Sequence, residues 1–307
     1  MEYDFSAILL ALTVVFGVVW GLDRLFLYKK RKARLDAAGE AYRDPVPVDW
    51  SRSLFPVVLI VLLLRTFVAE PFRIPSGSMM PTLDVGDFIL VNKFAYGLRL
   101  PVTNTKILDI GEPKLGDVVV FRWPGFTCDR DGKLVHGGDP DCTTPVPRQD
   151  WIKRVIGVPG DTISVRNSQI VINGKPVVAD EIGPFKGNPA RTDDNLLMSW
   201  NATIWNEHLG KVNHLIARMP ERGPTPPIPN PEVPAFAKAF AQGKDAVVVP
   251  KGYYLVMGDD RENSEDSRYW GFLPEKNLAG KAFLIWMSWR GWGTGGIDFH
   301  RIGKLIH

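Results

Sequence analysis

The chain has 307 residues, 45% of them apolar, and a formal net charge of +3. This length suits one large or two ordinary domains, and the apolar content allows a sizeable core, which excludes wholesale disorder. The positive charge is spread along the chain apart from one run at 29–34, KKRKAR, so the charge pattern argues against nucleic acid as a partner.

Two apolar runs near the N-terminus are candidate membrane spans. Residues 6–28 are interrupted only by Asp23 and Arg24, and the run is long enough for a bilayer, which requires about 20 residues. The second run, 54–70, is shorter and carries Arg65, whose charged end can extend to the membrane interface. Two core helices of a soluble protein would also be apolar, but the basic segment between the runs disfavours that alternative.

The charges around these runs predict an orientation. Residues 29–53 between them are rich in Lys and Arg, whereas residues 1–5 carry neither. By the positive-inside rule the basic segment is cytoplasmic, and residues 1–5 and 71–307 lie on the opposite side. A removable signal peptide would carry its positive charge before the apolar core, whereas here the charge follows it.

After Glu70 the sequence becomes strand-like, which predicts a mainly β domain over 71–307. Short runs rich in Val, Ile, Phe and Tyr are bounded by turn residues, and a two-residue hairpin turn is expected at Asn173-Gly174. The runs are 87–94, 116–123, 151–158, 162–174, 246–258 and 281–289. From about 185 to 242 the strand signal is weak and prolines gather at 218–234, so this stretch is interpreted as an insertion. It is either a semi-rigid surface excursion or a segment that binds a partner recognising extended proline-rich chain.

No metal or cofactor is predicted. Cys128 and Cys142 have no histidine or further cysteine at metal-ligand spacing, so zinc is disfavoured, and a disulfide and two free thiols remain equal alternatives. The five histidines accompany neither a GxSxG nor an HExxH motif, so neither an α/β-hydrolase triad nor a metal hydrolase is indicated.

Three polar motifs could carry chemistry instead. IPSGSMMPTL, at 74–83, is rich in turn formers and predicts a surface loop directly after the second apolar run. MGDDRENSEDSRYWGF, at 257–272, mixes charges, hydroxyls and aromatics as hydrogen-bonded loop networks do. In it Asp266 and Arg268 could form an ion pair, and Ser264 offers a hydroxyl to a neighbouring amine.

The third motif, WIKRVIGVPGD, places Lys153 in an expected strand. A strand lysine usually lies on a solvated face, and the local sequence alone favours that reading. Burial against apolar neighbours would instead lower the pKa of the amine, so that it could serve a serine nucleophile as base. Strand alternation predicts two faces, one with Trp151, Lys153 and Val155 and the other with Ile152, Arg154 and Ile156.

Together the three motifs, in this order after two apolar runs, resemble the bacterial type I signal peptidases, the Ser-Lys leader peptidases. The resemblance extends from the second run to the C-terminal RIGKLIH. It implies a β-rich periplasmic catalytic domain anchored in the bacterial inner membrane by two N-terminal transmembrane helices. The implied activity is cleavage of signal peptides from exported preproteins after small residues of the Ala-X-Ala type. The implied partners are signal peptides and membrane lipid, and the enzyme could lie close to the secretion translocon.

The resemblance also implies roles for single residues. Ser78 is the nucleophile and Lys153 the general base, positioned by Ser264. The oxyanion is held by the Ser76 hydroxyl and the backbone N–H of Ser78, and the Asp266–Arg268 ion pair supports the site from behind. The residues expected to line shallow S1 and S3 pockets are Ile74, Pro75, Met79, Leu83, Trp151 and Ile152.

Some features depart from the family pattern or leave alternatives. Cys128 and Cys142 precede the lysine motif, whereas in enterobacterial members a cysteine pair follows it, and the proline-rich insertion has no role by analogy. Trp286, Trp289 and Trp292 suit either a lipid-contacting surface or ordinary core and rim positions.

Two other classes of function remain to be weighed against a peptidase. A membrane-tethered β-domain that only binds partners would have no reason to keep Ser78, Lys153 and Ser264 together. A self-cleaving Ser-Lys repressor would need a soluble DNA-binding region, against which the two apolar runs argue.

Overall fold

The computed structural model describes residues 5–39, 41–99, 105–124, 127–128, 134–136, 149–166, 169–185, 202–219, 246–291 and 295–307. These residues form two compact units. The first contains residues 1–70 and 97–110, and the second contains residues 71–96 and 111–307. Cys142, Trp292 and the prolines at 220–234 lie outside the described residues, and so does any cysteine pairing.

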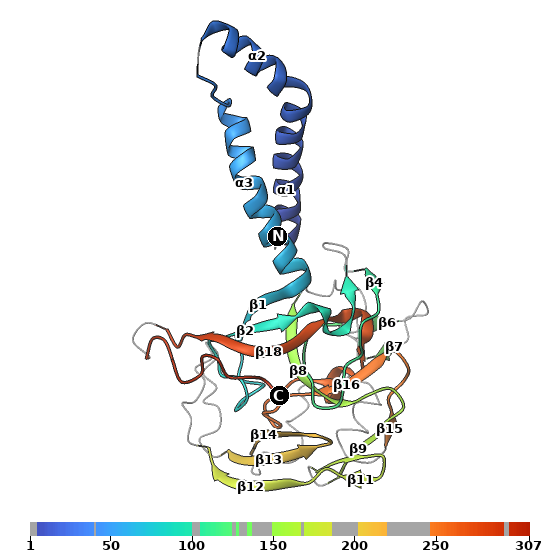
Figure 1. Cartoon of the computed structure of the whole chain (residues 1–307). Coiled ribbons are helices and arrows are strands. Elements are labelled where there is room, and N and C mark those ends of the chain that lie inside the picture. Colours follow the sequence, from blue (N-terminus) through green and yellow to red (C-terminus); the bar gives the residue numbers. More distant parts are fainter. Residues whose placement is uncertain are drawn as a thin grey trace. The chain divides into compact units, whose positions relative to one another are not determined.

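The first unit is helical. Helix α1 (Phe5–Leu22) continues through a π-helical turn (Asp23–Leu27) into α2 (Tyr28–Ala38), and α3 (Val46–Leu63) continues through a second π-helical turn (Leu64–Val68). Helices α1 and α3 lie side by side (Figure 1), with the rings of Trp20 and Phe55 centred 5.6 Å apart. A Cβ at Gly17 would lie 2.9 Å from the Phe55 ring, so glycine permits this approach. The short strands β3 (Leu98–Arg99) and β4 (Lys106–Leu108) complete the unit.

Two stretches of these helices, Ala7–Ala38 and Val46–Thr66, are long and apolar enough to cross a membrane. Only 17% and 11% of the residues in their apolar windows are buried, whereas a core helix of a soluble protein would be mostly buried. The helix boundaries differ from the expected 6–28 and 54–70. Most of the basic segment is helical, because Lys, Arg, Leu and Ala favour helix even where hydropathy is low.

The second unit is mainly β, as predicted. Its largest sheet has the strand order β1-β2-β18-β5-β8-β16-β17, and the strand pairs from β2 to β17 are antiparallel. The strands are β1 (Ala69–Arg73), β2 (Asp87–Asn92), β5 (Val118–Arg122), β8 (Asp150–Gly157), β16 (Tyr253–Met257), β17 (Leu273–Pro274) and β18 (Leu278–Ser288). Strands β2, β5, β8, β16 and β18 each overlap a run expected from the sequence, whereas β1 lies outside the expected runs.

Strand β5 shows how this sheet is packed. Val118 and Val120 belong to one apolar cluster, and Val119 and Phe121 belong to another. The strand is therefore buried on both faces, which is why it is continuously apolar rather than alternating. Its neighbour β8 is also buried on both faces, so any polar side chain on β8 must find its partners inside the protein.

A second sheet has the order β11-β10-β9-β15, from β9 (Thr162–Arg166), β10 (Gln169–Ile172), β11 (Lys175–Pro176) and β15 (Val247–Val248). The predicted hairpin turn is confirmed, because Ile172 pairs with Lys175 across Asn173-Gly174. Both turn residues have positive φ, 51° and 77°, as a two-residue hairpin turn of type I′ requires.

The third sheet corrects the interpretation of 185–242. Strands β13 (Thr203–Leu209) and β14 (Val212–Arg218) form a hairpin that pairs with β12 (Ala179–Pro184). The expectation of little strand over this stretch was therefore wrong for 203–218. Charged and polar side chains interrupt the apolar alternation in the hairpin, and some of them are buried among partners from elsewhere in the chain. The pair β6 (Thr127–Cys128) and β7 (Leu134–His136) completes the strands.

Candidate active site

The turn at 74–83 is fixed to the sheet at both ends. The Ile74 N–H donates to the Asp87 carbonyl, and the Gly86 N–H donates to the Ile74 carbonyl. Met79 and Leu83 are fully buried in the core on one face of the main sheet. The turn was correctly predicted, but it is not a surface loop, because its apolar side chains anchor it in the core. Only its start, at Pro75 and Ser76, is exposed.

This turn presents Ser78 to Lys153 of β8. The Lys153 Nζ and the Ser78 Oγ lie 2.7 Å apart, and both residues are buried, with 4% and 9% of their surface exposed. The expectation that Lys153 would occupy a solvated face was wrong. The predicted alternation is right, since Nζ lies 5.4 Å from the centre of the Trp151 ring on the same strand face.

Burial changes the protonation of this lysine. It lowers the pKa of the Lys153 amine to about 8, although the charges of Asp266 and Glu265 act to raise it. Lys153 makes no ion pair within the described residues, so a buried ammonium would be poorly compensated there. A neutral amine at this distance can accept the proton of a serine hydroxyl, so the arrangement is suited to a serine nucleophile in acyl transfer.

The loop at 258–266 packs against the turn that carries Ser78. The Asp260 N–H donates to the Ser78 carbonyl over 3.1 Å. A Cβ at Gly258 would lie 2.4 Å from the same carbonyl oxygen and 2.2 Å from the Ser264 Oγ. The loop therefore contacts the main chain of the candidate nucleophile directly, and glycine is needed for that contact.

The predicted ion pair of this loop is present. Arg268 donates to both carboxylate oxygens of Asp266 over 2.8 Å, and both side chains are buried. Burial acts to raise the pKa of Asp266, but the Arg268 guanidinium and hydrogen bonds from Gly258 and Ser264 hold it below its usual value. The Ser264 hydroxyl donates to Asp266 over 2.8 Å, and this is its hydrogen bond in the described structure, rather than one to Lys153.

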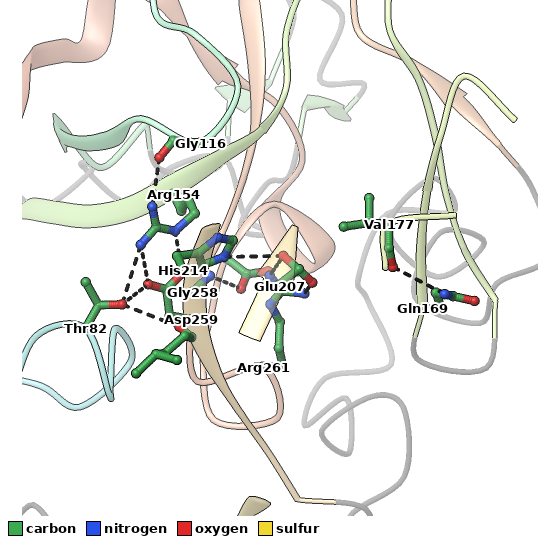
Figure 2. Close-up of polar contacts among 12 residues, drawn as sticks. Thr82, Gly116, Arg154, Gln169, Val177, Glu207, His214, Gly258, Asp259 and Arg261 are labelled. Carbon is green, nitrogen blue, oxygen red and sulfur yellow. Dashed lines mark hydrogen bonds and ion pairs between the residues drawn. The ribbon is translucent and has the colours of Figure 1, made fainter. Parts of the chain in front are cut away.

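A second buried ion pair was not predicted. Arg154, next to Lys153 on β8, donates to both carboxylate oxygens of Asp259 over 2.8 and 2.7 Å (Figure 2). Thr82, in the turn of Ser78, donates to Asp259 over 2.5 Å. The expected alternation put Arg154 opposite Lys153 in a buried strand, and a buried arginine requires a partner. That signal was available, but Asp259 itself could not be identified from spacing.

The residues expected to line the substrate pockets fall into three groups. Ile74, Met79, Leu83 and Ile152 belong to one core cluster, and Met79 and Leu83 have no exposed surface. Trp151 packs on the other face of β8 and stacks with Trp123, the ring centres lying 5.3 Å apart. Pro75 is exposed, and so is Ser76, for whose hydroxyl no contact is described.

No group of histidine, cysteine and carboxylate side chains suited to a metal ion occurs among the described residues.

Gly258→Ala tests whether the contact between the loop and the turn is as tight as described. The added methyl group overlaps a backbone oxygen, so we expect the free energy of unfolding to fall by about 1–3 kcal/mol. Urea denaturation of the detergent-solubilised protein measures this. Gly21→Ala is the control, since nothing lies within 4 Å of the added atom. Equal stability of both variants and the wild type would show that the loop is not packed on the turn.

Comparison with known proteins identifies relatives over the whole chain. The family model "Signal peptidase, peptidase S26" matches residues 48–289. A signal peptidase I of Pseudomonas aeruginosa is 35% identical and covers 100% of both chains. One of Pseudomonas fluorescens is 37% identical, with 94% of each chain covered. A solved signal peptidase I of Enterococcus faecalis matches 56% of this chain and 98% of its own at 22% identity, with a TM-score of 0.26, too low to add to the fold description.

Proposed function

The chain belongs to the signal peptidase family, peptidase S26, and we propose that it is a membrane-anchored serine endopeptidase that removes signal peptides from exported preproteins. Ser78 is the nucleophile and Lys153 the general base. The observation that carries this assignment is the 2.7 Å separation of Nζ and Oγ in a buried setting.

The reaction follows from this geometry in two steps. The Ser78 Oγ attacks the carbonyl carbon before the cleaved bond, and its proton passes to the Lys153 Nζ. The same proton then goes to the leaving amine as the peptide C–N bond breaks, which leaves an acyl ester on Ser78. Lys153 next accepts a proton from water as the water attacks the ester, and it returns the proton to the Ser78 oxygen when the acyl group leaves.

The negative oxygen that forms in both steps requires hydrogen-bond donors. The Ser76 hydroxyl and the Ser78 N–H take this role, and the exposed position of Ser76, two residues before the nucleophile, leaves its hydroxyl accessible to a substrate. We assign to Ser264 the positioning of the amine; its hydroxyl donates to Asp266, so the Asp266–Arg268 pair holds Ser264 in place.

The preference for small residues before the cleaved bond is attributed to the packing around the dyad. Met79, Leu83 and Ile152 are buried in one core cluster, and a side chain as small as alanine would disturb their packing least. Ile74, Pro75 and Trp151 complete the proposed binding surface.

The proposed location follows from the basic segment between the two helices. With that segment in the cytoplasm, both helices cross the inner membrane and residues 71–307 lie in the periplasm, where exported preproteins emerge. Ser78 follows the end of the second helical segment by ten residues. Lipid contact by Trp286, which is 41% exposed, and a position close to the secretion translocon belong to the same proposal.

Protease added to intact spheroplasts tests this orientation. We expect digestion of the region after Glu70, while the basic segment at 29–53 stays protected until the membrane is permeabilised. The opposite pattern of protection would reverse the topology.

Ser78→Ala and Lys153→Ala should each abolish cleavage of a preprotein by the purified protein, because each removes one half of the dyad. Ser76→Ala should slow cleavage by a factor on the order of 100, since an oxyanion donor contributes about 3 kcal/mol. Gel analysis of the product, with its N-terminal sequence, measures both effects. Normal cleavage by both dyad variants would contradict the mechanism, whereas absence of cleavage by the wild type would leave the binding-domain alternative.

The pH dependence follows from the direction of the Lys153 shift. Only the neutral amine accepts a proton, so kcat/KM should rise about tenfold per pH unit below the pKa of about 8 and level off above it. An unshifted lysine would instead give a rise that continues to about pH 10.4. Initial rates between about pH 5.5 and pH 10 distinguish these two profiles, with enzyme stability checked at each pH. This range extends roughly two units on either side of the expected pKa.

A further inference from the structure

The β13–β14 hairpin is hydrogen-bonded to the loop that contacts Ser78. The Ala217 N–H donates to the Asp259 carbonyl over 2.9 Å, and the Arg261 N–H donates to the Ala217 carbonyl over 3.0 Å. Asp260 lies between Asp259 and Arg261 in the chain, and its N–H donates to the Ser78 carbonyl. The loop therefore lies between the hairpin and the main chain of the nucleophile, and a shift of the hairpin would be passed to Ser78.

Side chains join the same two elements. Glu207 and His214 face each other across the β13–β14 ladder. Arg261 donates to both carboxylate oxygens of Glu207 over 2.6 and 2.5 Å. The His214 Nε2 lies 3.3 Å from a Glu207 oxygen and 3.8 Å from an Asp259 oxygen, so the imidazole lies between the two carboxylates, and neither ring nitrogen makes a hydrogen bond of ordinary geometry in the described structure (Figure 2). All four side chains are buried.

The charges of this cluster balance only while the imidazole is neutral. The groups that face it are Glu207 from β13, Asp259 and Arg261 from the loop, and Arg154 from β8. Two carboxylates and two guanidinium groups cancel. Burial lowers the pKa of His214, although both carboxylates act to raise it, so the side chain is uncharged at neutral pH. Protonation would leave the buried cluster with one excess positive charge.

Asp259 links this cluster to both halves of the dyad. It accepts hydrogen bonds from Arg154, which follows Lys153 on β8, and from Thr82, four residues after Ser78. A change in the position of Asp259 would therefore act on the strand of the base and on the turn of the nucleophile together.

We propose that His214 is a positioning residue for the cleavage reaction: as a neutral imidazole between Glu207 and Asp259, it holds the 259–261 segment in the geometry that aligns Ser78 with Lys153. It touches no reacting atom and acts through Asp259 and the loop. The inference rests on the proposed roles of Ser78 and Lys153. The β13–β14 hairpin, for which the sequence predicted no function, would thereby influence the rate of the chemical step through the loop.

His214→Ala and His214→Gln, made in the full-length protein in detergent, test this with a preprotein substrate. We expect His214→Ala to lower kcat about tenfold with little change in KM, because alignment is lost while the binding surface is kept. His214→Gln, which keeps a neutral polar group, should recover most of the loss. The control is His208→Ala on the same hairpin, whose exposed imidazole binds Asp180 and Asn213 and should leave kcat unchanged.

The pH profile separates positioning from simple stabilisation. In the wild type, protonation of His214 below its lowered pKa should add to protonation of Lys153, so that log(kcat/KM) falls more steeply on the acid side than one unit per pH unit. His214→Gln should fall with the slope of Lys153 alone. Rates are compared at a temperature at which thermal unfolding curves show every variant fully folded.

Wild-type kcat in His214→Ala, or identical acid slopes in the wild type and His214→Gln, would overturn the proposal. A kcat loss that disappears once the folded fractions are matched would do the same. Ser78→Ala in the same assay keeps the two proposals distinct. If it cleaves normally the proposed function fails, whereas if it is inactive while His214→Ala is normal, only the role of His214 fails.

Discussion

The site depends on the burial of one amine. Lys153 is buried, and Asp266, the acidic residue whose charge acts on it most strongly, is paired with Arg268. An ammonium in such a place loses its hydration without gaining an equal partner, so the neutral form is favoured. The proximity of Ser78 then gives that neutral amine a proton to accept.

Two basic residues, Lys153 and Arg154, are buried on opposite faces of β8, and their burial has different consequences. Arg154, on the face away from Lys153, is fully buried, and a buried guanidinium requires a partner of opposite charge. Asp259 compensates that charge with two hydrogen bonds. Lysine can release its proton, so the same depth of burial favours a neutral amine on one face and a fixed ion pair on the other.

Local patterns in the sequence predicted much of this architecture. The apolar runs indicated β2, β5, β8 and β18, the Asn173-Gly174 pair indicated a hairpin, and the alternation in β8 separated Lys153 from Arg154. The resemblance that the three motifs carry implied the pairing of Ser78 with Lys153 and that of Asp266 with Arg268. What the sequence did not reveal depends on contacts between distant segments. Lys153 is buried because the turn of Ser78 and the loop at 258–266 pack around it. No local pattern in the sequence predicts this packing. The β13–β14 hairpin was missed because Glu207 and His214 look like solvated residues until Arg261 and Asp259 are placed beside them.

The most direct test of the account is an NMR titration of the side-chain amines in protein labelled with isotopic lysine, with the Lys153 signal assigned by its absence from Lys153→Ala. The account predicts that one amine titrates at about 8 while exposed lysines titrate near their ordinary value of about 10.4. If the Lys153 signal titrates with the exposed lysines, the amine is charged at neutral pH, and the proposed role of Lys153 as base is wrong.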